Sequence, residues 1–199
     1  MSKHTKDSTS CPVCNSTIRF MRYDSVNAGI NPELKEQILD GSFGEVKCPK
    51  CGATCNLVYN FLYHDMKDKY LICVGTDYTD TMREFGKPEG YKLRYVAGIQ
   101  HLVDKIHIFD AGLDDVIMEL TKQWMRDKEG IDGELFFVET QDDELVFAWP
   151  DEMKGLGVSK KLYDDCKESI VDLGFREADT FFKIDMEYGK TIKAALSNC

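Results

Sequence analysis

Two pairs of cysteines lie near the start of the chain, in the stretches CPVC (residues 11–14) and CPKCG (residues 48–52). The two intervening residues of each pair allow both sulfur atoms to face one ion at a distance of about 2.3 Å. Four thiolates complete a tetrahedron around zinc and leave no coordination position open for water or substrate. The spacing therefore predicts one structural zinc ion, bound by Cys11, Cys14, Cys48 and Cys51.

The residues that flank each pair fit a tight metal-binding turn. A proline follows the first cysteine of each pair and fixes one backbone dihedral angle. The residue after the second cysteine often needs a left-handed conformation, which Gly52 adopts freely and Asn15 tolerates better than most side chains. An iron–sulfur cluster and a redox-active dithiol stay open as alternatives. A redox Cys-x2-Cys motif opens a helix, however, and neither pair here is followed by a helical pattern.

The histidines offer a second candidate site. His64 and Asp65 are adjacent in the stretch YHDM, and an enzyme could use such a pair for acid–base chemistry or a second metal ion. Because no nucleophile motif accompanies the pair, we favour a hydrogen-bonded turn. His101 and His107 are six residues apart and do not share a face of a helix, so we interpret both as structural.

Four further cysteines lie outside the two pairs. Cys55 could exchange into the metal site or act as a thiol sensor, but we favour a small apolar residue at the start of a strand. We interpret Cys73 as a core residue and Cys166 as part of the apolar face of a helix, and we assign no role to Cys199.

The composition limits the classes of partner. The chain has 199 residues, 43% of them hydrophobic, and a net charge of −10. Residues 61–149 hold most of the excess acid, with ten Lys and Arg against nineteen Asp and Glu. Such a surface repels nucleic acid and anionic membranes, and only Arg19, Arg22, Lys47 and Lys50 offer a basic surface. With no apolar run of membrane-spanning length and no secretory signal, we expect a soluble cytoplasmic protein.

The pattern of apolar residues predicts both helices and strands. A helix is expected over residues 31–41, with Asn31 as its cap, Pro32 in its first turn and Gly41 at its end. Two amphipathic helices are expected within residues 99–128, interrupted at FDAG, and both are expected to pack on a sheet. Strands are expected at residues 18–26, 55–59, 70–74, 91–96 and 180–184, together with a hairpin at 134–150 and a helix after Ser159.

These elements predict an α+β protein. We expect an N-terminal four-cysteine zinc ribbon with a helical insertion, fused to a sheet covered by two helices. The expected division is a flexible tail (residues 1–10), the zinc-ribbon module (11–63), an α+β core (64–149) and a C-terminal α/β extension (150–199). Pro150 and the glycines at 155 and 157 mark the last boundary.

The order of these stretches resembles the CpXC family of bacteria and archaea. The similarity covers residues 11 to about 130 and rests on CPVC, YDSVNAGINPELKEQILDGSFGEVKCPKCG, NFLYHDMKDKYLI, YKLRYV and IFDAGLDD. The resemblance implies a zinc-binding set of cysteines and no defined activity. Asn15 departs from the glycine that commonly follows such a turn, and residues past about 150 lie outside the similarity.

Together these patterns predict a cytoplasmic, zinc-stabilised protein-interaction module whose partner is a protein. The first alternative is a zinc ribbon that associates with nucleic acid or the ribosome, and the second is an enzyme with a site around His64 and Asp65. A catalytic site needs a pocket that converges on these two side chains, whereas an interaction module needs only an exposed apolar patch, with the acidic middle region or the aromatic-rich hairpin as the expected contact surface.

Overall fold

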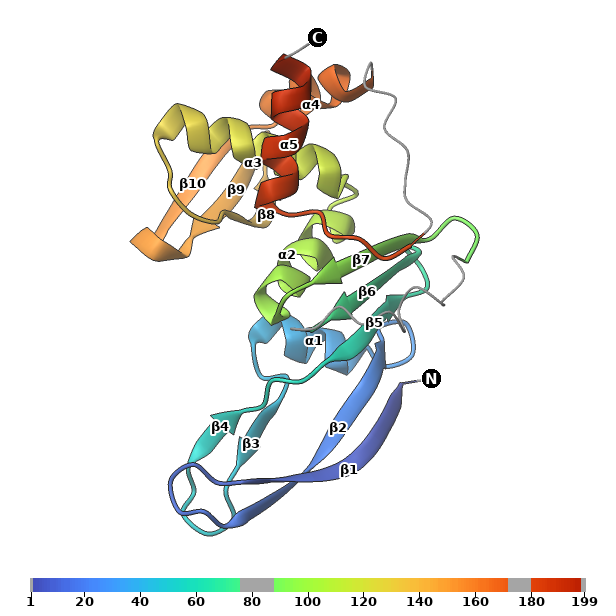
Figure 1. Cartoon of the computed structure of the whole chain (residues 1–199), viewed down its shortest axis with the longest axis vertical. Coiled ribbons are helices and arrows are strands. Elements are labelled where there is room, and N and C mark those ends of the chain that lie inside the picture. The colour runs from blue at the N-terminus through green and yellow to red at the C-terminus, as the bar shows by residue number, and fades with distance from the viewer. Residues whose placement is uncertain (1, 76–87, 172–179, 198–199) are drawn as a thin grey trace. The chain divides into compact units, whose positions relative to one another are not determined.

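The structure is a computed structural model that describes residues 2–75, 88–171 and 180–197 (Figure 1). The chain divides into two compact units, Met1–Ile99 and Gln100–Cys199. The described residues form five α-helices and three β-sheets, which confirms a mixed α and β fold. The division at residue 99 differs from the expected boundaries near residues 63 and 149. No described helix has both the length and the apolar character needed to cross a membrane.

The first unit is built on a five-stranded sheet with the order β1-β2-β5-β6-β7. The β1–β2 and β5–β6 pairs are antiparallel, and the β2–β5 and β6–β7 pairs are parallel. Strands β2, β6 and β7 agree with the predicted strands, whereas β5 was not predicted. The strands are β1 (Lys3–Ser10), β2 (Thr17–Asn27), β5 (Phe61–Asp65), β6 (Tyr70–Val74) and β7 (Lys92–Val96).

Strand β1 replaces most of the flexible tail expected at residues 1–10. It pairs with β2 along its whole length, and the backbone N–H of Lys3 also donates to Oγ of Ser25 at 3.1 Å. β1 contains no apolar side chain, and none of its side chains is buried. Hydrogen bonds to β2 therefore hold this strand, and a search for hydrophobic alternation cannot find it.

A helix and a small hairpin lie between β2 and β5 in the chain. Helix α1 (Pro32–Asp40) buries Leu34 and Ile38 and ends at Gly41, whose φ of 81° is left-handed as predicted. The predicted side-chain cap is absent, since Oδ1 of Asn31 accepts no hydrogen bond from a backbone N–H of the helix, while its Nδ2 donates to Oε1 of Glu33 at 2.7 Å. The hairpin consists of β3 (Glu45–Lys47) and β4 (Thr54–Asn56), the latter shorter than the strand expected at residues 55–59.

The second unit combines four helices with a three-stranded antiparallel sheet of order β10-β9-β8. A 3-10 turn at Pro150–Glu152 connects the predicted hairpin to an unpredicted third strand. Gly157 lies within that strand, and a Cβ atom there would lie 2.9 Å from the Glu144 carboxylate. The strands are β8 (Phe136–Gln141), β9 (Glu144–Trp149) and β10 (Lys154–Ser159).

The two predicted helices belong to this second unit. They are α2 (Ile99–Asp110) and α3 (Asp115–Glu129), separated by a turn at Gly112 with φ of 68°. Asp114 caps α3 by accepting a hydrogen bond from the backbone N–H of Val116 at 2.9 Å. Helix α2 contacts the sheet, since Nδ1 of His107 donates to the carbonyl oxygen of Phe137 at 3.2 Å.

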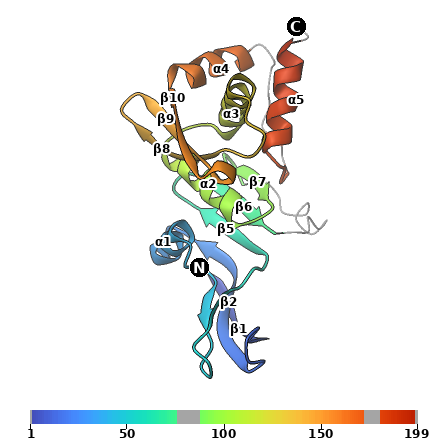
Figure 2. The ribbon, with the colours of Figure 1, turned by 90° about the vertical axis from the view of Figure 1, so that its left-hand side faces the viewer.

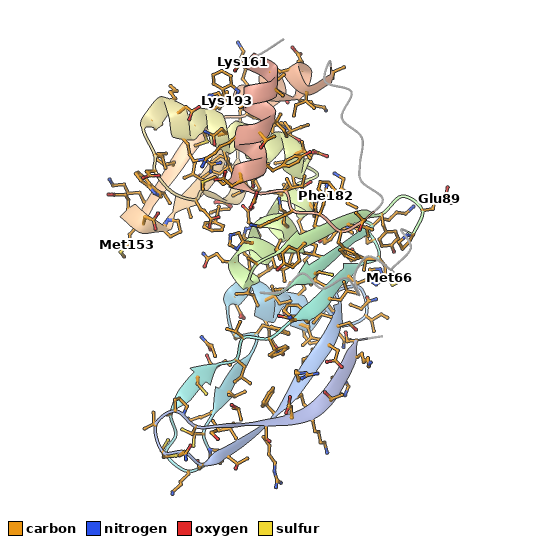
Figure 3. The ribbon with its side chains drawn as sticks, in the orientation of Figure 1. Met66, Glu89, Met153, Lys161, Phe182 and Lys193 are labelled. Atoms are coloured by element: carbon orange, nitrogen blue, oxygen red, sulfur yellow. The ribbon has the colours of Figure 1, made fainter. Side chains whose placement is uncertain are left out.

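Two C-terminal helices pack against α3. Helix α4 (Lys161–Val171) was predicted, whereas α5 (Met186–Ser197) was not. The strand expected at residues 180–184 is reduced to a single bridge residue at Phe182, labelled in Figure 3. Lys193 of α5, also labelled there, lies 3.6 Å from the centre of the Trp124 ring and pairs with Asp127. A close approach between α3 and α5 requires Gly189, where a Cβ atom would lie 2.6 Å from the carbonyl oxygen of Glu119.

Charged side chains occupy the core of this second unit. Lys122 is 1% exposed and donates to both carboxylate oxygens of Asp104, at 2.9 and 2.7 Å, and to Glu119 at 2.9 Å. Burial alone would lower the pKa of Lys122, but the charges of Asp104 and Glu119 outweigh it and raise that pKa. Asp104 also accepts a hydrogen bond from the backbone N–H of Phe137 at 2.6 Å, and so joins α2, α3 and β8.

We predict that Asp104→Ala lowers the free energy of unfolding of the second unit by about 3–5 kcal/mol, because it removes the main counter-charge of a buried lysine. Urea denaturation of the two proteins measures the difference. The exposed Asp132 provides the control, and Asp132→Ala should change the free energy by no more than about 0.5 kcal/mol. Equal effects of the two substitutions would contradict a buried ion cluster.

Candidate metal centre

The two cysteine pairs form turns with the same hydrogen bonds, each at the tip of a hairpin. In the β1–β2 hairpin, the backbone N–H of Cys11 donates to the Ser16 carbonyl at 2.8 Å, and that of Asn15 donates to the Cys11 carbonyl at 2.9 Å. The β3–β4 hairpin repeats both bonds. There the N–H of Cys48 donates to the Ala53 carbonyl at 2.8 Å, and that of Gly52 donates to the Cys48 carbonyl at 3.0 Å.

Each turn closes with one residue in the left-handed region. Asn15 has φ of 57° and Gly52 has φ of 75°, as predicted from their positions after the second cysteine. The turn directs both sulfur atoms of a pair to one side of its hairpin. The hairpin tips lie side by side (Figures 1 and 2), so that sulfur atoms from both meet.

The four predicted ligands converge on one point. The Sγ atoms of Cys11 and Cys51 lie 3.6 Å apart, as do those of Cys14 and Cys48. All four sulfur atoms lie within 4.8 Å of one another. A tetrahedral ion at about 2.3 Å from each sulfur needs sulfur–sulfur distances of about 3.8 Å. The four cysteines therefore lie close enough to hold a metal ion.

An apolar shell covers one side of the cysteine cluster. Cys11 and Cys48 are each 2% exposed and pack with Ile18, whereas Cys51 is exposed. Cys55 is half-buried in the same shell, and its Sγ approaches the carbonyl oxygen of Val46 at 3.8 Å. Cys55 does not belong to the group of four sulfur atoms, which agrees with its interpretation as a packed strand residue.

Ser16 connects the two turns and was not recognised in the sequence. Its Oγ lies 3.0 Å from Sγ of Cys14 and 3.1 Å from Sγ of Cys48. A hydrogen bond from this hydroxyl is the largest of the causes that lower the pKa of the Cys48 thiol to about 5. Serine is too common beside cysteine for its position alone to have indicated this role.

The pKa of Cys51 shifts in the opposite direction. A hydrogen bond from the backbone of Ala53 acts to lower the pKa of Cys51. Partial desolvation of the sulfur atom and the hydrogen bonds with Cys14, Cys48 and Cys11 outweigh it and raise the pKa to about 12. Without a positive charge, four sulfur atoms at this spacing cannot all ionise. A divalent ion would remove the repulsion and hold all four as thiolates.

Neither cysteine pair has the setting of a redox dithiol. Both pairs lie in hairpin turns between strands, whereas a reactive Cys-x2-Cys motif gains its low pKa at the start of a helix. The buried thiols Cys73 and Cys166 lie elsewhere in the fold, and burial raises the pKa of each. Cys199 lies outside the described residues.

His64 and Asp65 do not form a joint site. They are consecutive residues of β5, so their side chains point to opposite faces of the sheet. His64 contacts the Tyr91 hydroxyl through Nε2 at 3.1 Å, while Asp65 accepts from the backbone N–H of Lys67 at 2.9 Å and closes the turn after the strand. The turn favoured from the sequence is therefore present at Asp65.

His101 and His107 do not form a joint site either, and one of the basic residues near the cysteine turns is already paired with acidic side chains. Nε2 of His101 contacts the Glu134 carboxylate at 3.1 Å, a different partner from that of His107. Of the four basic residues named above, Arg22 is engaged by Asp24 at 2.9 Å and by Asp7 at 3.4 Å. These ion pairs reduce the positive charge available near the cysteine turns.

Comparison with known protein families supports the resemblance seen in the sequence. The model of the CpXC family, described as CpXC protein, matches residues 9–122. The matched range contains all four clustered cysteines and ends within α3. No curated protein and no solved structure matches the chain.

We predict that Ser16→Ala weakens zinc binding by about 10- to 100-fold, because the thiolates of Cys14 and Cys48 lose a shared hydrogen-bond donor. Competition with a chromophoric zinc chelator measures the affinity. Ser8→Ala removes an exposed hydroxyl from β1 and should leave the affinity unchanged. Equal affinities of the Ser16 and Ser8 variants would show that the hydroxyl does not support the site.

Proposed function

The chain belongs to the CpXC family, and we propose that it binds one structural zinc ion that holds together a protein-interaction module. Cys11, Cys14, Cys48 and Cys51 would be the ligands. The observation that carries this proposal is the convergence of four sulfur atoms from two hairpin tips on one tetrahedral position.

The chemistry of the ligands favours zinc. Four thiolates suit zinc or an iron–sulfur centre, and zinc is common where two cysteine turns face each other. A four-sulfur shell leaves no position for water, so the ion would supply folding free energy and not Lewis-acid catalysis. Because the ligands must stay reduced, we place the protein in the cytoplasm.

The architecture supports a binding role over a catalytic one. The hairpins β1–β2 and β3–β4 hold several exposed side chains beyond the cysteine cluster, and an ion that joins their tips would keep that surface rigid. The enzyme alternative needs His64 and Asp65 to converge, and they occupy opposite faces of β5. We propose a protein partner, because the net charge of −10 opposes general binding of nucleic acid.

We predict about one zinc ion per chain in protein purified without chelators. Inductively coupled plasma mass spectrometry of the pure protein measures zinc and iron together. Iron in place of zinc would support the iron–sulfur alternative, and the absence of both metals would contradict the proposed centre.

We also predict that Cys48→Ser unfolds the hairpin region while the second unit stays folded. A structural zinc ion contributes about 10–16 kcal/mol of apparent binding free energy in small peptides, comparable with the net stability of a whole domain. Limited proteolysis should give new cleavage between residues 11 and 60 and protection of residues 100–171. Cys73→Ser, a buried cysteine outside the cluster, should not release zinc. Unchanged cleavage in Cys48→Ser would argue against a structural ion.

The same two proteins test the interaction role. Affinity capture from the native cell, with mass spectrometry of the bound proteins, should recover a partner with the zinc-loaded protein and lose it with Cys48→Ser. Recovery of RNA or ribosomes in place of a protein partner would favour the first alternative.

A further inference from the structure

One face of the β1–β2 hairpin is basic and exposed. Direct cross-strand partners share a face of a sheet, and the register pairs His4 with Tyr23, Lys6 with Met21 and Ser8 with Arg19. We call these six residues the basic hairpin face. Tyr23 is half-buried and the other five side chains are exposed, including Met21 at 39%. A shallow hollow of about 620 Å³ extends over this stretch of the hairpin and is lined from both faces, by Lys6, Ser8, Arg19 and Met21 and by Asp7 and Phe20.

The acidic residues of this hairpin lie on its other side. Asp7 alternates with Lys6 along β1, and its carboxylate meets the Arg22 guanidinium at 3.4 Å. Asp24 is bound to the same guanidinium at 2.9 Å. Within the described part of the chain, neither Lys6 nor Arg19 forms an ion pair. A chain of net charge −10 therefore presents two uncompensated cations together on one face.

Strand β1 also has an open backbone edge. It is the first strand of the sheet order β1-β2-β5-β6-β7, and among the residues that the structure describes it pairs only with β2 (Figure 1). An edge strand can accept an additional strand, which gains main-chain hydrogen bonds and specificity from its alternate side chains. Alternate side chains of an added strand would lie on the same face as Lys6 and Arg19 and would repeat at the same spacing. Acidic side chains at these positions would contact Lys6 on the neighbouring strand β1, and long ones would reach Arg19 on β2.

From this combination we propose that the β1 edge and the basic hairpin face bind an extended acidic segment of a partner protein. This inference rests on the proposed interaction function and names the chemistry of the partner. An acidic strand fits this face better than nucleic acid does. A strand with acidic residues at alternate positions needs only a few cations to neutralise it, whereas every nucleotide adds a negative charge that the protein as a whole repels. The His4–Tyr23 ring pair, with centroids 5.6 Å apart, and Met21 offer apolar contact beside the cations.

A peptide titration with the zinc-loaded full-length protein tests the proposal. The probe is a fluorescein-labelled decapeptide of alternating Glu and Thr, and the matched probes are the Lys–Thr decapeptide and a ten-nucleotide oligothymidine. Fluorescence anisotropy should detect binding of the Glu–Thr peptide and not of the Lys–Thr peptide. Hydrogen exchange at residues 3–10 should slow on binding, while exchange at the opposite edge strand, β7, should not change.

Charge reversal identifies the surface. Lys6→Glu combined with Arg19→Glu should weaken peptide binding by at least about ten-fold, because it places like charges opposite each other. The control is Lys161→Glu combined with Lys167→Glu on α4, which changes the net charge by the same amount; Lys161 is labelled in Figure 3. This control should change the affinity for the peptide less than about two-fold. Zinc content and circular dichroism confirm that both variants are folded.

Three results would overturn the proposal: no binding of the Glu–Thr peptide, equal affinity in both charge-reversal variants, or tighter binding of oligothymidine than of the peptide. The capture experiment separates this inference from the proposed function. If the wild type and Lys6→Glu/Arg19→Glu recover the same amount of a partner, the proposed interaction function would stand. Its contact surface would then lie outside the basic hairpin face.

Discussion

The meeting of four sulfur atoms between two hairpin tips is the constraint on which the first unit depends. Cys11 and Cys51, whose sulfur atoms meet, are 40 residues apart in the chain, and an isolated two-stranded hairpin is marginally stable at best. Strand β2 carries this constraint into the main sheet, because it pairs with β1 near the cysteines and with β5 at Ser25–Asn27. The cysteine cluster and the sheet therefore share one continuous strand.

The second unit is stabilised in a different way. Asp104, Asp115 and Glu119 lie in its core with Lys105 and Lys122, at Nζ–O distances of 3.1 Å for Lys105–Asp115 and 2.7 Å for Lys122–Asp104. Part of the acidic charge counted in residues 61–149 is therefore internal and largely offset by these two lysines. The net charge still describes the long-range field of the protein, but the distribution of surface charge has to be taken from the fold. The basic hairpin face is an example, since its acidic neighbours point away from it.

Features set by local spacing could be predicted from the sequence. The cysteine turns, their left-handed residues Asn15 and Gly52, and the Gly41 end of α1 each follow from a few adjacent residues. Features that depend on distant partners could not. β1 has no apolar pattern. The glycines of β10 resemble a linker in the sequence, and only the fold shows that Gly157 leaves room for the Glu144 side chain on the neighbouring strand. Lys122 and Asp104 resemble solvent-exposed helix residues until their helices meet, and Ser16 gains its role only when the second turn brings Cys48 to it.

The placement of each cysteine pair within a single hairpin also affects the order of folding. Each hairpin joins strands that are neighbours in the chain, and such hairpins form within microseconds. Each half-site with its two sulfur atoms can thus assemble before any long-range contact. The step that costs most conformational entropy is closure of the loop between Cys14 and Cys48, which are 34 residues apart. An ion bound by the two cysteines of one hairpin would then bind those of the other hairpin. The slow step, in which the two hairpin tips meet, would be made by a chain that already holds the ion. With the proposed ion bound, this topology would couple the rate of folding to the supply of the ion.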